Sequence, residues 1–150
     1  MAVDRDHVIY AGTLGLGVSK STDGGATWTA AGTGLGSAPT VFALLFDNPQ
    51  APTVLYAATN SGVFKTANGG TTWTAVSTGL PSATAVRVLT GPAQTPATLY
   101  AGTTSRGVFK TTDGGTLWSA FNSGLESALA ITALAVDPQA QATQIGRAHV

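Results

Sequence analysis

The sequence has no cysteine among its 150 residues, and only 9% of the residues are charged. Without cysteine, disulfides, thiolate nucleophiles and thiolate-bound zinc are excluded. Seven basic and seven acidic residues give a formal net charge of zero. The chain therefore has no excess of positive charge with which to hold nucleic acid or an anionic membrane surface, and we expect neither as a partner.

Long apolar runs and helix-favouring residues are also scarce. No apolar run approaches the roughly 20 residues that a membrane span needs, and MAVDRDHV lacks the basic start and apolar stretch of a signal peptide. Glu occurs only as Glu126 and Met only as Met1, whereas 19 glycines and many Thr and Ala favour strands and tight turns. No segment keeps a 3.6-residue apolar period. We predict an all-β fold with no helix longer than a turn.

What the sequence does contain is one unit written three times. Trp28, Trp73 and Trp118 stand 45 residues apart, and so do the Gly-Leu pairs that follow them. These tryptophans end the segments STDGGATW, TANGGTTW and TTDGGTLW, which we call the box turns: residues 21–28, 66–73 and 111–118. Ahead of the box turns stand GVSK, GVFK and GVFK, preceded by VIYAGT, VLYAAT and TLYAGT. A period of 45 with four short strands per unit is typical of β-propeller blades.

Each box turn places one polar side chain, Asp23, Asn68 or Asp113, before glycine. Such side chains accept backbone N–H bonds of a turn, and glycine adopts the positive φ that a turn needs. Because the positions recur with the fold, we interpret them as turn formers rather than catalytic groups. A buried Trp contributes at most ~4–6 kcal/mol by area, so we predict that all three tryptophans are buried between neighbouring sheets in equivalent places.

The pattern Ser/Thr-x-Asp-x-Gly-x-Thr-Trp resembles the Asp-box, or BNR, repeat of sialidase-type propellers. The wider repeat is similar to those of bacterial exported, sortilin-like, xyloglucanase-like and photosystem II assembly-factor-like propellers. Two positions depart from the pattern, Asn68 for Asp and Leu117 for Thr. The residues to which the resemblance assigns a structural Asp-box role are Ser21, Asp23, Gly25, Thr27, Trp28, Thr66, Asn68, Gly70, Thr72, Trp73, Thr111, Asp113, Gly115 and Trp118.

The repeat divides the chain into blades. In the second unit, β-branched and aromatic runs predict strands at residues 41–46, 54–58, 63–66 and 72–76. The start Ala2-Val3-Asp4 matches residues 135–137, so Met1 falls inside a strand. We therefore expect a partial propeller over residues 1–143, truncated at both ends. Its parts are a blade remnant at 1–35, blades at 36–80 and 81–125, and the opening strand of a next blade at 126–143.

Residues 144–150, QIGRAHV, break the repeat abruptly. By register, Ala142-Thr143 should lead into Leu-Tyr, as Ala97-Thr98 leads into Leu99-Tyr100. The codons ATC GGA AGA GCA CAC GTC spell Ile-Gly-Arg-Ala-His-Val and look like a common short-read sequencing adapter. We interpret residues 144–150 as adapter read-through rather than natural protein.

Strand alternation places the box turns on one face and the loops between strands two and three, and between blades, on the opposite face. In sialidase-like relatives the opposite face carries the active site. The residues on it with binding chemistry are Asn60, Arg106 and Glu126, of which Glu126 is the only acid. No arginine or tyrosine stands in a sialidase-like context, and an ordinary glycosidase needs two carboxylates. His7 is the only histidine before residue 144, so we expect no metal, no cofactor and no His-based triad.

From these features we predict that the chain is a non-catalytic propeller segment of an exported bacterial protein, with a binding or scaffolding role. The resemblance leaves two alternatives, a fragment of a xyloglucanase-like glycoside hydrolase and a photosystem II assembly-factor-like propeller. Expected partners are missing blades of the same chain and a carbohydrate or protein ligand. The resemblance implies a periplasmic, cell-surface or secreted location. Lys20, Lys65 and Lys110 recur at one repeat position, which favours a snorkelling role over a ligand role.

Overall fold

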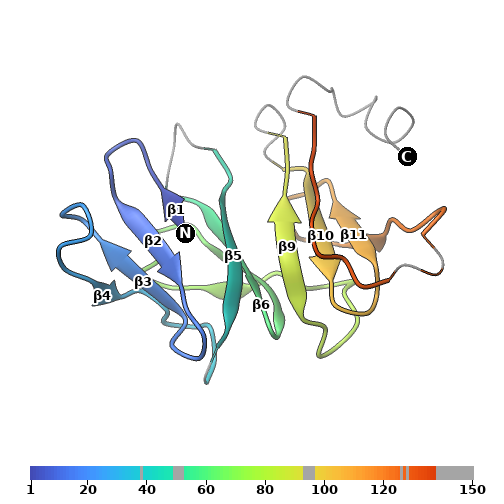
Figure 1. The fold of residues 1–150 in the computed structure, drawn as a ribbon, viewed down its shortest axis with the longest axis horizontal. Coiled ribbons are helices and arrows are strands. Elements are labelled where there is room, and N and C mark those ends of the chain that lie inside the picture. Colours follow the sequence, from blue (N-terminus) through green and yellow to red (C-terminus); the bar gives the residue numbers. More distant parts are fainter. Residues whose placement is uncertain (38, 49–52, 93–96, 126, 128, 138–150) are drawn as a thin grey trace.

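The structure is a computed structural model that describes residues 1–37, 39–48, 53–92, 97–125, 127 and 129–137. Within these residues the chain forms three four-stranded antiparallel sheets and no helix (Figure 1). The prediction of an all-β fold is therefore confirmed. Glu126 and residues 144–150 lie outside the described residues, so the adapter interpretation stays a prediction.

Each sheet is a meander in which consecutive strands are neighbours. The first sheet contains β1 (Ala2–Val3), β2 (Ile9–Gly12), β3 (Val18–Ser21) and β4 (Thr29–Ala30). The second contains β5 (Val41–Phe46), β6 (Leu55–Thr59), β7 (Gly62–Thr66) and β8 (Thr74–Ala75). The third contains β9 (Val86–Thr90), β10 (Leu99–Thr103), β11 (Val108–Thr111) and β12 (Ser119–Ala120).

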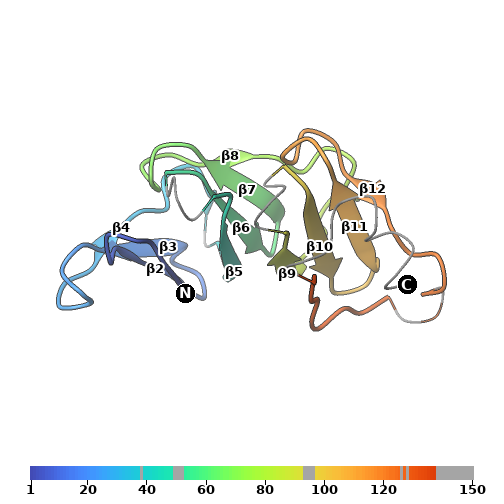
Figure 2. The same ribbon diagram turned by 90° about the horizontal axis from the view of Figure 1, so that it is seen from above.

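The three sheets stand side by side as blades of a fan. Seen from above, β5 and β9 lie on the concave side, whereas β8 and β12 lie on the outer side (Figure 2). The strands β5 and β9 also contact one another across the blade boundary. The first strand of each blade is therefore innermost, as in a propeller.

The strands match the prediction closely except for the fourth. The strand at residues 41–46 coincides with β5, but the strand predicted at 72–76 is reduced to Thr74–Ala75. The reason is hydrogen bonding outside the sheet. The Thr72 N–H donates to Asn68 Oδ1 at 2.9 Å, and the Trp73 N–H donates to the Thr33 carbonyl of the preceding blade at 2.8 Å.

The first and last segments of the repeat differ in secondary structure. The short strand β1 pairs with β2 through Ala2 opposite Tyr10 and Val3 opposite Ile9, as its match to residues 135–137 predicts. In contrast, residues 131–137 contain no strand, and the rest of the predicted opening strand at 126–143 lies largely outside the described residues, so the division into blades at this end stays a prediction. Residue Ile131 is nevertheless anchored, because its N–H donates to the Thr103 carbonyl at 2.9 Å.

The hydrophobic core lies between the blades rather than within any single one. One cluster joins the first and second blades through Tyr10, Val18, Leu35, Val41, Leu55 and Trp73. A second joins the second and third blades through Tyr56, Val63, Val86, Leu99 and Trp118. A third gathers Ile131, Leu134 and Val136 against Tyr100 and Val108 of the third blade. Each blade is therefore stabilised mainly by its neighbours, as expected for a repeat protein.

The three tryptophans are not equivalent, which corrects the prediction that all are buried. Trp73 and Trp118 are 3% and 2% exposed, but Trp28 is 43% exposed. The indole Nε1 of Trp73 donates to the Ala31 carbonyl, and that of Trp118 to the Val76 carbonyl, both at 2.7 Å. Each acceptor belongs to the preceding blade. The first blade has no predecessor among the described residues, so Trp28 lacks the surface that buries the other two.

Candidate functional site

The box turns connect the third and fourth strands of each blade, and their polar side chains bond back onto the turn itself. In the first box turn, the Gly25 N–H donates to Ser21 Oγ and the Thr27 N–H donates to Asp23 Oδ1, both at 2.8 Å. The Ser21 hydroxyl donates to the same carboxylate oxygen at 2.8 Å. The glycine at position 24 has a φ of 72°, a conformation that residues with a Cβ resist. The arrangement is that of a fixed turn.

The two departures from the repeat pattern alter few of these contacts. Asn68 accepts the Thr72 N–H and the Thr66 hydroxyl through Oδ1, each at 2.9 Å, so a neutral amide replaces the carboxylate. In the third box turn the Leu117 N–H still donates to Asp113 Oδ1 at 3.0 Å. Only the hydroxyl contact that Thr27 gives to Asp23 is missing there.

Hydrogen bonds to the box-turn carboxylates lower their pKa values. The hydroxyl and the N–H of Thr27, followed by the Ser21 hydroxyl, lower the pKa of Asp23 from 3.8 to about 2. The pKa of Asp113 is lowered by the Thr111 hydroxyl first and the Leu117 N–H second. Both groups are therefore charged in the fold under all but strongly acidic conditions.

We expect these carboxylates to make stability depend on pH in the acid range. The pKa of Asp23 is lower in the fold than in the unfolded chain, so its stabilising contribution is present above about pH 4 and is lost as the pH falls towards 2. Replacing Asp23 by Asn keeps the turn contacts without the charge, as Asn68 does. The difference in urea midpoint between the parent and Asp23→Asn should therefore shrink between pH 4 and 2.

The reverse change, Asn68→Asp, is the matched control for the pH prediction. It should add an acid-sensitive contribution at the equivalent turn. A midpoint difference between parent and Asp23→Asn that stays constant over this range would contradict the assignment of the low pKa to the folded turn.

The box turns also join neighbouring blades. The Tyr10 hydroxyl donates to the Gly69 carbonyl at 3.2 Å, and the Tyr56 hydroxyl donates to the Gly114 carbonyl at 3.0 Å. Lys20 Nζ lies 5.3 Å from the centre of the Tyr10 ring and also donates to the Gly69 carbonyl at 3.3 Å. Lys65 and Lys110 lie in the same way over the rings of Tyr56 and Tyr100, so all three repeated lysines follow a tyrosine ring, as a snorkelling side chain does.

Asp47 is the described carboxyl group whose pKa rises. Burial raises it, while the Lys65 ammonium works in the opposite direction. Burial, assisted by the charge of Asp47, also raises the pKa of the neighbouring Tyr56 to about 12. Burial is the first cause of both shifts, and no second carboxyl group acts on Asp47.

The opposite face carries the loops between strands two and three and the connections between blades. Asn60 Oδ1 accepts the Thr40 N–H at 3.1 Å, so this side chain fixes the entry to β5. Arg106 is exposed, and its carbonyl accepts a bond from Asn122 Nδ2 at 3.2 Å. The third predicted residue of this face, Glu126, is not described. The first-blade loop instead presents Leu14 and Leu16, each 81% exposed.

The sequence reasoning missed a pair on the innermost strands. The Arg87 guanidinium of β9 lies 4.7 Å from the centre of the Phe42 ring of β5, across the blade boundary. Each is the second residue of its strand, close to the end at which the strand leaves the opposite face. The signal available in the sequence is the position of Arg87 between Val86 and Val88, which an alternating strand turns away from the core.

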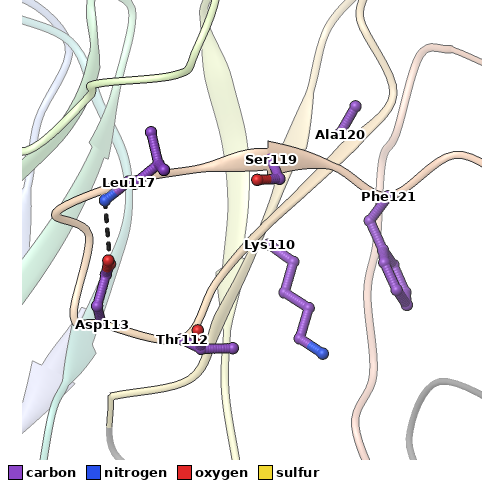
Figure 3. Close-up of a pocket in the computed structure, with 7 residues that line it drawn as sticks. All are labelled: Lys110, Thr112, Asp113, Leu117, Ser119, Ala120 and Phe121. Carbon is purple, nitrogen blue, oxygen red and sulfur yellow. Dashed lines mark hydrogen bonds between the residues drawn. The ribbon is translucent and has the colours of Figure 1, made fainter.

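A shallow pocket of about 270 Å³ lies on the third blade. Its lining residues are Lys110, Thr112, Asp113, Leu117, Ser119, Ala120 and Phe121 (Figure 3). The Lys110 Nζ lies 5.4 Å from the centre of the Phe121 ring, and the Leu117 N–H reaches Asp113. In the described part of the chain no three His, Asp or Glu side chains gather as metal ligands, and no helix is long and apolar enough to cross a membrane.

Comparison with known proteins identifies the architecture. A family model described as the DUF6242 beta propeller domain matches residues 1–147. No curated protein matches the chain.

Three solved structures illustrate the likeness. A GH74 enzyme from Niastella koreensis has a TM-score of 0.64 and 24% identity, with 80% of this chain and 20% of that one covered. The extracellular domain of the hybrid two-component system BT4673 from B. thetaiotaomicron has a TM-score of 0.64 and 16% identity, with 87% and 17% covered. YCF48 bound to D1 peptide has a TM-score of 0.58 and 19% identity, with 77% and 38% covered. The chain therefore spans well under half of each of these proteins, and at these identities the likeness concerns the fold.

Proposed function

The chain belongs to the DUF6242 beta propeller domain family, and from this premise we propose that it is a non-catalytic binding segment that uses the face opposite the box turns. The polar side chains of all three box turns bond within their own turn, and the second and third box turns also bond to the preceding blade. The opposite face is where exposed side chains are left free to meet a ligand.

One observation carries the proposal: the sequence gives the opposite face a single carboxylate, Glu126, and the described residues of that face add no second one. Hydrolysis of a glycosidic bond by the usual mechanisms needs two carboxyl groups at a defined separation. What this face offers instead is the Arg87 guanidinium stacked on Phe42, with the exposed Arg106 on a neighbouring loop. A guanidinium held against a ring is a preorganised group for binding a ligand rather than for transferring protons.

The comparisons suggest two classes of ligand for such a face. The GH74 likeness points to carbohydrate, and it also keeps open a role as part of a xyloglucanase-like hydrolase. The YCF48 structure, which contains a bound D1 peptide, points to a peptide and to the assembly-factor alternative. The extracellular domain among the similar structures supports an exported location.

The test is a binding screen against immobilised xyloglucan oligosaccharides and a peptide array. We expect Arg87→Ala to weaken the strongest interaction about tenfold, since a central arginine contributes more than about 1 kcal/mol to binding. Arg5→Ala is the matched control, because Arg5 is an exposed arginine in the loop between β1 and β2, on the box-turn face. Equal losses in both variants would contradict the placement of the site.

Catalysis is tested separately with the same protein. Incubation with xyloglucan and with β-glucan should release no reducing sugar above a blank without protein. Turnover above that blank would favour the hydrolase alternative over the binding proposal.

A further inference from the structure

The innermost strands β5 and β9, which lie on the concave side of the fan (Figure 2), carry a β-bulge at the same place. In β5 the pairing with β6 shifts between Val41 and Ala43, so Phe42 is an extra residue with no partner in the ladder. In β9 the pairing with β10 skips Arg87 in the same way. Phe42 and Arg87 stand 45 residues apart, at one position of the repeat. A bulge redirects the side chain that it inserts.

The residue before each bulge serves the fold. Val41 is buried, and its N–H donates to the Thr13 carbonyl of the preceding blade at 2.9 Å. Val86 stands at the same repeat position and is fully buried. Ile131 stands there in the next unit, and its N–H donates to the Thr103 carbonyl at 2.9 Å. Packing between blades therefore requires a β-branched apolar residue at this position.

The bulge position itself holds a different kind of side chain in each unit, namely Phe42, Arg87 and Thr132. Arg87 is exposed and Phe42 is half-buried, and the guanidinium lies 4.7 Å from the ring centre. A residue that serves only the fold recurs with the repeat, as Val41 and Val86 do, whereas a residue that contacts a ligand is free to differ between blades. The variation at the bulge position favours a role in binding over a role in packing.

The backbone at both bulges is held by the loop between the second and third strands of the same blade. In the second blade, the Thr40 N–H donates to Asn60 Oδ1 and the Asn60 N–H donates to the Thr40 carbonyl, both at 3.1 Å. In the third blade, the Thr104 N–H donates to the Ala85 carbonyl at 3.1 Å. Arg106 is exposed on this last loop. The loop and the bulge of the third blade therefore present two guanidinium groups on one face.

The charge of this region favours an anionic ligand. Among the described residues no carboxylate pairs with Arg87, whose guanidinium lies against the Phe42 ring. Glu126, the one acid that the sequence gives this face, lies outside the described residues. A guanidinium presents paired N–H donors that match the two oxygens of a carboxylate. Because the ring already restricts the guanidinium, less side-chain freedom is lost when a ligand binds.

The aromatic residues favour a peptide over a polysaccharide as the source of the carboxylate. A polysaccharide site usually lays a sugar ring flat against an exposed aromatic ring, which provides a broad apolar face. Here the guanidinium lies over the ring of Phe42. Trp73, Trp118 and all three tyrosines are buried, and Trp28 belongs to a box turn on the other face. An acidic side chain of a peptide needs only the guanidinium donors.

We propose that Arg87, inserted by its bulge and held against Phe42, binds an aspartate or glutamate side chain of an acidic peptide. The guanidinium donates two N–H bonds to the carboxylate, and Phe42 is a positioning residue that acts through the guanidinium. The residue at the bulge position thus sets the specificity of each blade. The proposal rests on the proposed binding function and narrows it to one class of ligand.

The first test is a peptide array in which every sequence appears twice, once with Asp or Glu and once with Asn or Gln. We expect the chain to bind acidic members and to bind their amide forms about tenfold more weakly, because a charge-assisted bidentate pair is lost. Equal binding of the two forms would refute the acidic-peptide proposal and leave the binding function standing. Binding to xyloglucan oligosaccharides or to oligogalacturonate, without any acidic peptide, would have the same meaning. Absence of binding to all of these probes would refute both.

The second test reverses the charge at the bulge. Arg87→Glu should invert the preference, so that the variant binds forms of the same peptides that carry Lys in place of the acid. Arg5→Glu is the matched control, because it makes the same change of charge at an exposed arginine on the box-turn face and should keep the parent preference. Urea unfolding of each variant shows that it is folded. A preference that Arg87→Glu leaves unaltered, or that Arg5→Glu alters equally, would overturn the proposal.

The third test examines the role of Phe42. Phe42→Leu and Arg87→Lys should each weaken binding of the best acidic peptide about threefold, the first by freeing the guanidinium and the second by replacing its planar donors with a point charge. In the Arg87→Ala background, Phe42→Leu should cause no further loss, since the ring acts through the guanidinium. Losses that simply multiply in the double variant would contradict the positioning role.

Discussion

Replacing Trp73 by alanine is expected to lower the free energy of unfolding by about 3–5 kcal/mol, the usual effect of truncating a buried aromatic side chain. Trp73 is 3% exposed and fills the space between the first two blades, and its indole N–H bonds to the Ala31 carbonyl. Truncation leaves both a cavity and a buried carbonyl without its donor. Urea unfolding followed by circular dichroism measures the loss without relying on Trp fluorescence.

Trp28→Ala is the matched control for this prediction, because it removes the same side chain from the same repeat position. We expect it to cost no more than about 1 kcal/mol, since a substitution at an exposed site has a small effect. Equal losses in the two variants would contradict the conclusion that a box-turn Trp stabilises the fold through the preceding blade.

Gly79→Ala is expected to be the second strongly destabilising change. A Cβ built at Gly79 would lie 2.1 Å from the Trp118 carbonyl oxygen and 3.0 Å from the Trp118 nitrogen. The backbones of two blades meet at this point, because the Trp118 N–H donates to the Thr78 carbonyl at 2.8 Å. A methyl group therefore forces the blades apart, in addition to the strain of a positive φ of 95°.

Gly124→Ala separates these two effects. Gly124 has a similar φ of 88°, but a Cβ there would meet no atom of the described residues within 4 Å. Both substitutions carry the conformational strain of about 1–2 kcal/mol, and Gly79→Ala should lose a further 1–3 kcal/mol, roughly, from overpacking. Thermal and urea unfolding of the two variants measure this difference. Equal destabilisation would mean that the close approach of the two blades matters little to stability.

The fold could be predicted from the sequence because the same pattern of strand and turn residues occurs in three copies. Strand alternation and turn glycines act within a few residues, so each copy of the unit specifies the same meander. The extent of the fourth strands was overestimated because hydrogen bonds to another blade, such as that of Trp73 to Thr33, are not visible in a local pattern.

Residues at equivalent positions of the repeat do not always have the same surroundings in the structure. Trp28 matches Trp73 in the repeat, yet what buries a box-turn Trp is the blade before it. Residues 131–136 match β5 in pattern, yet they contain no strand. Similarly, the pairing of Arg87 with Phe42 depends on two innermost strands that only the assembled blades bring together. The sequence pattern indicates which residues form strands and turns, but it does not show which segments from different blades come into contact.

The junction contacts also bear on how such a chain can change over evolutionary time. Every acceptor and donor at a junction is supplied by the same positions of adjoining units, as Tyr10 with Gly69 and Tyr56 with Gly114 show. Unequal recombination that gains or loses one whole 45-residue unit therefore recreates a matched junction at the new boundary. A cut at any other length would misalign the indole with its carbonyl and the phenol with its glycine. The propeller can thus alter its number of blades in a single step, and selection then acts on ring closure rather than on the individual contacts.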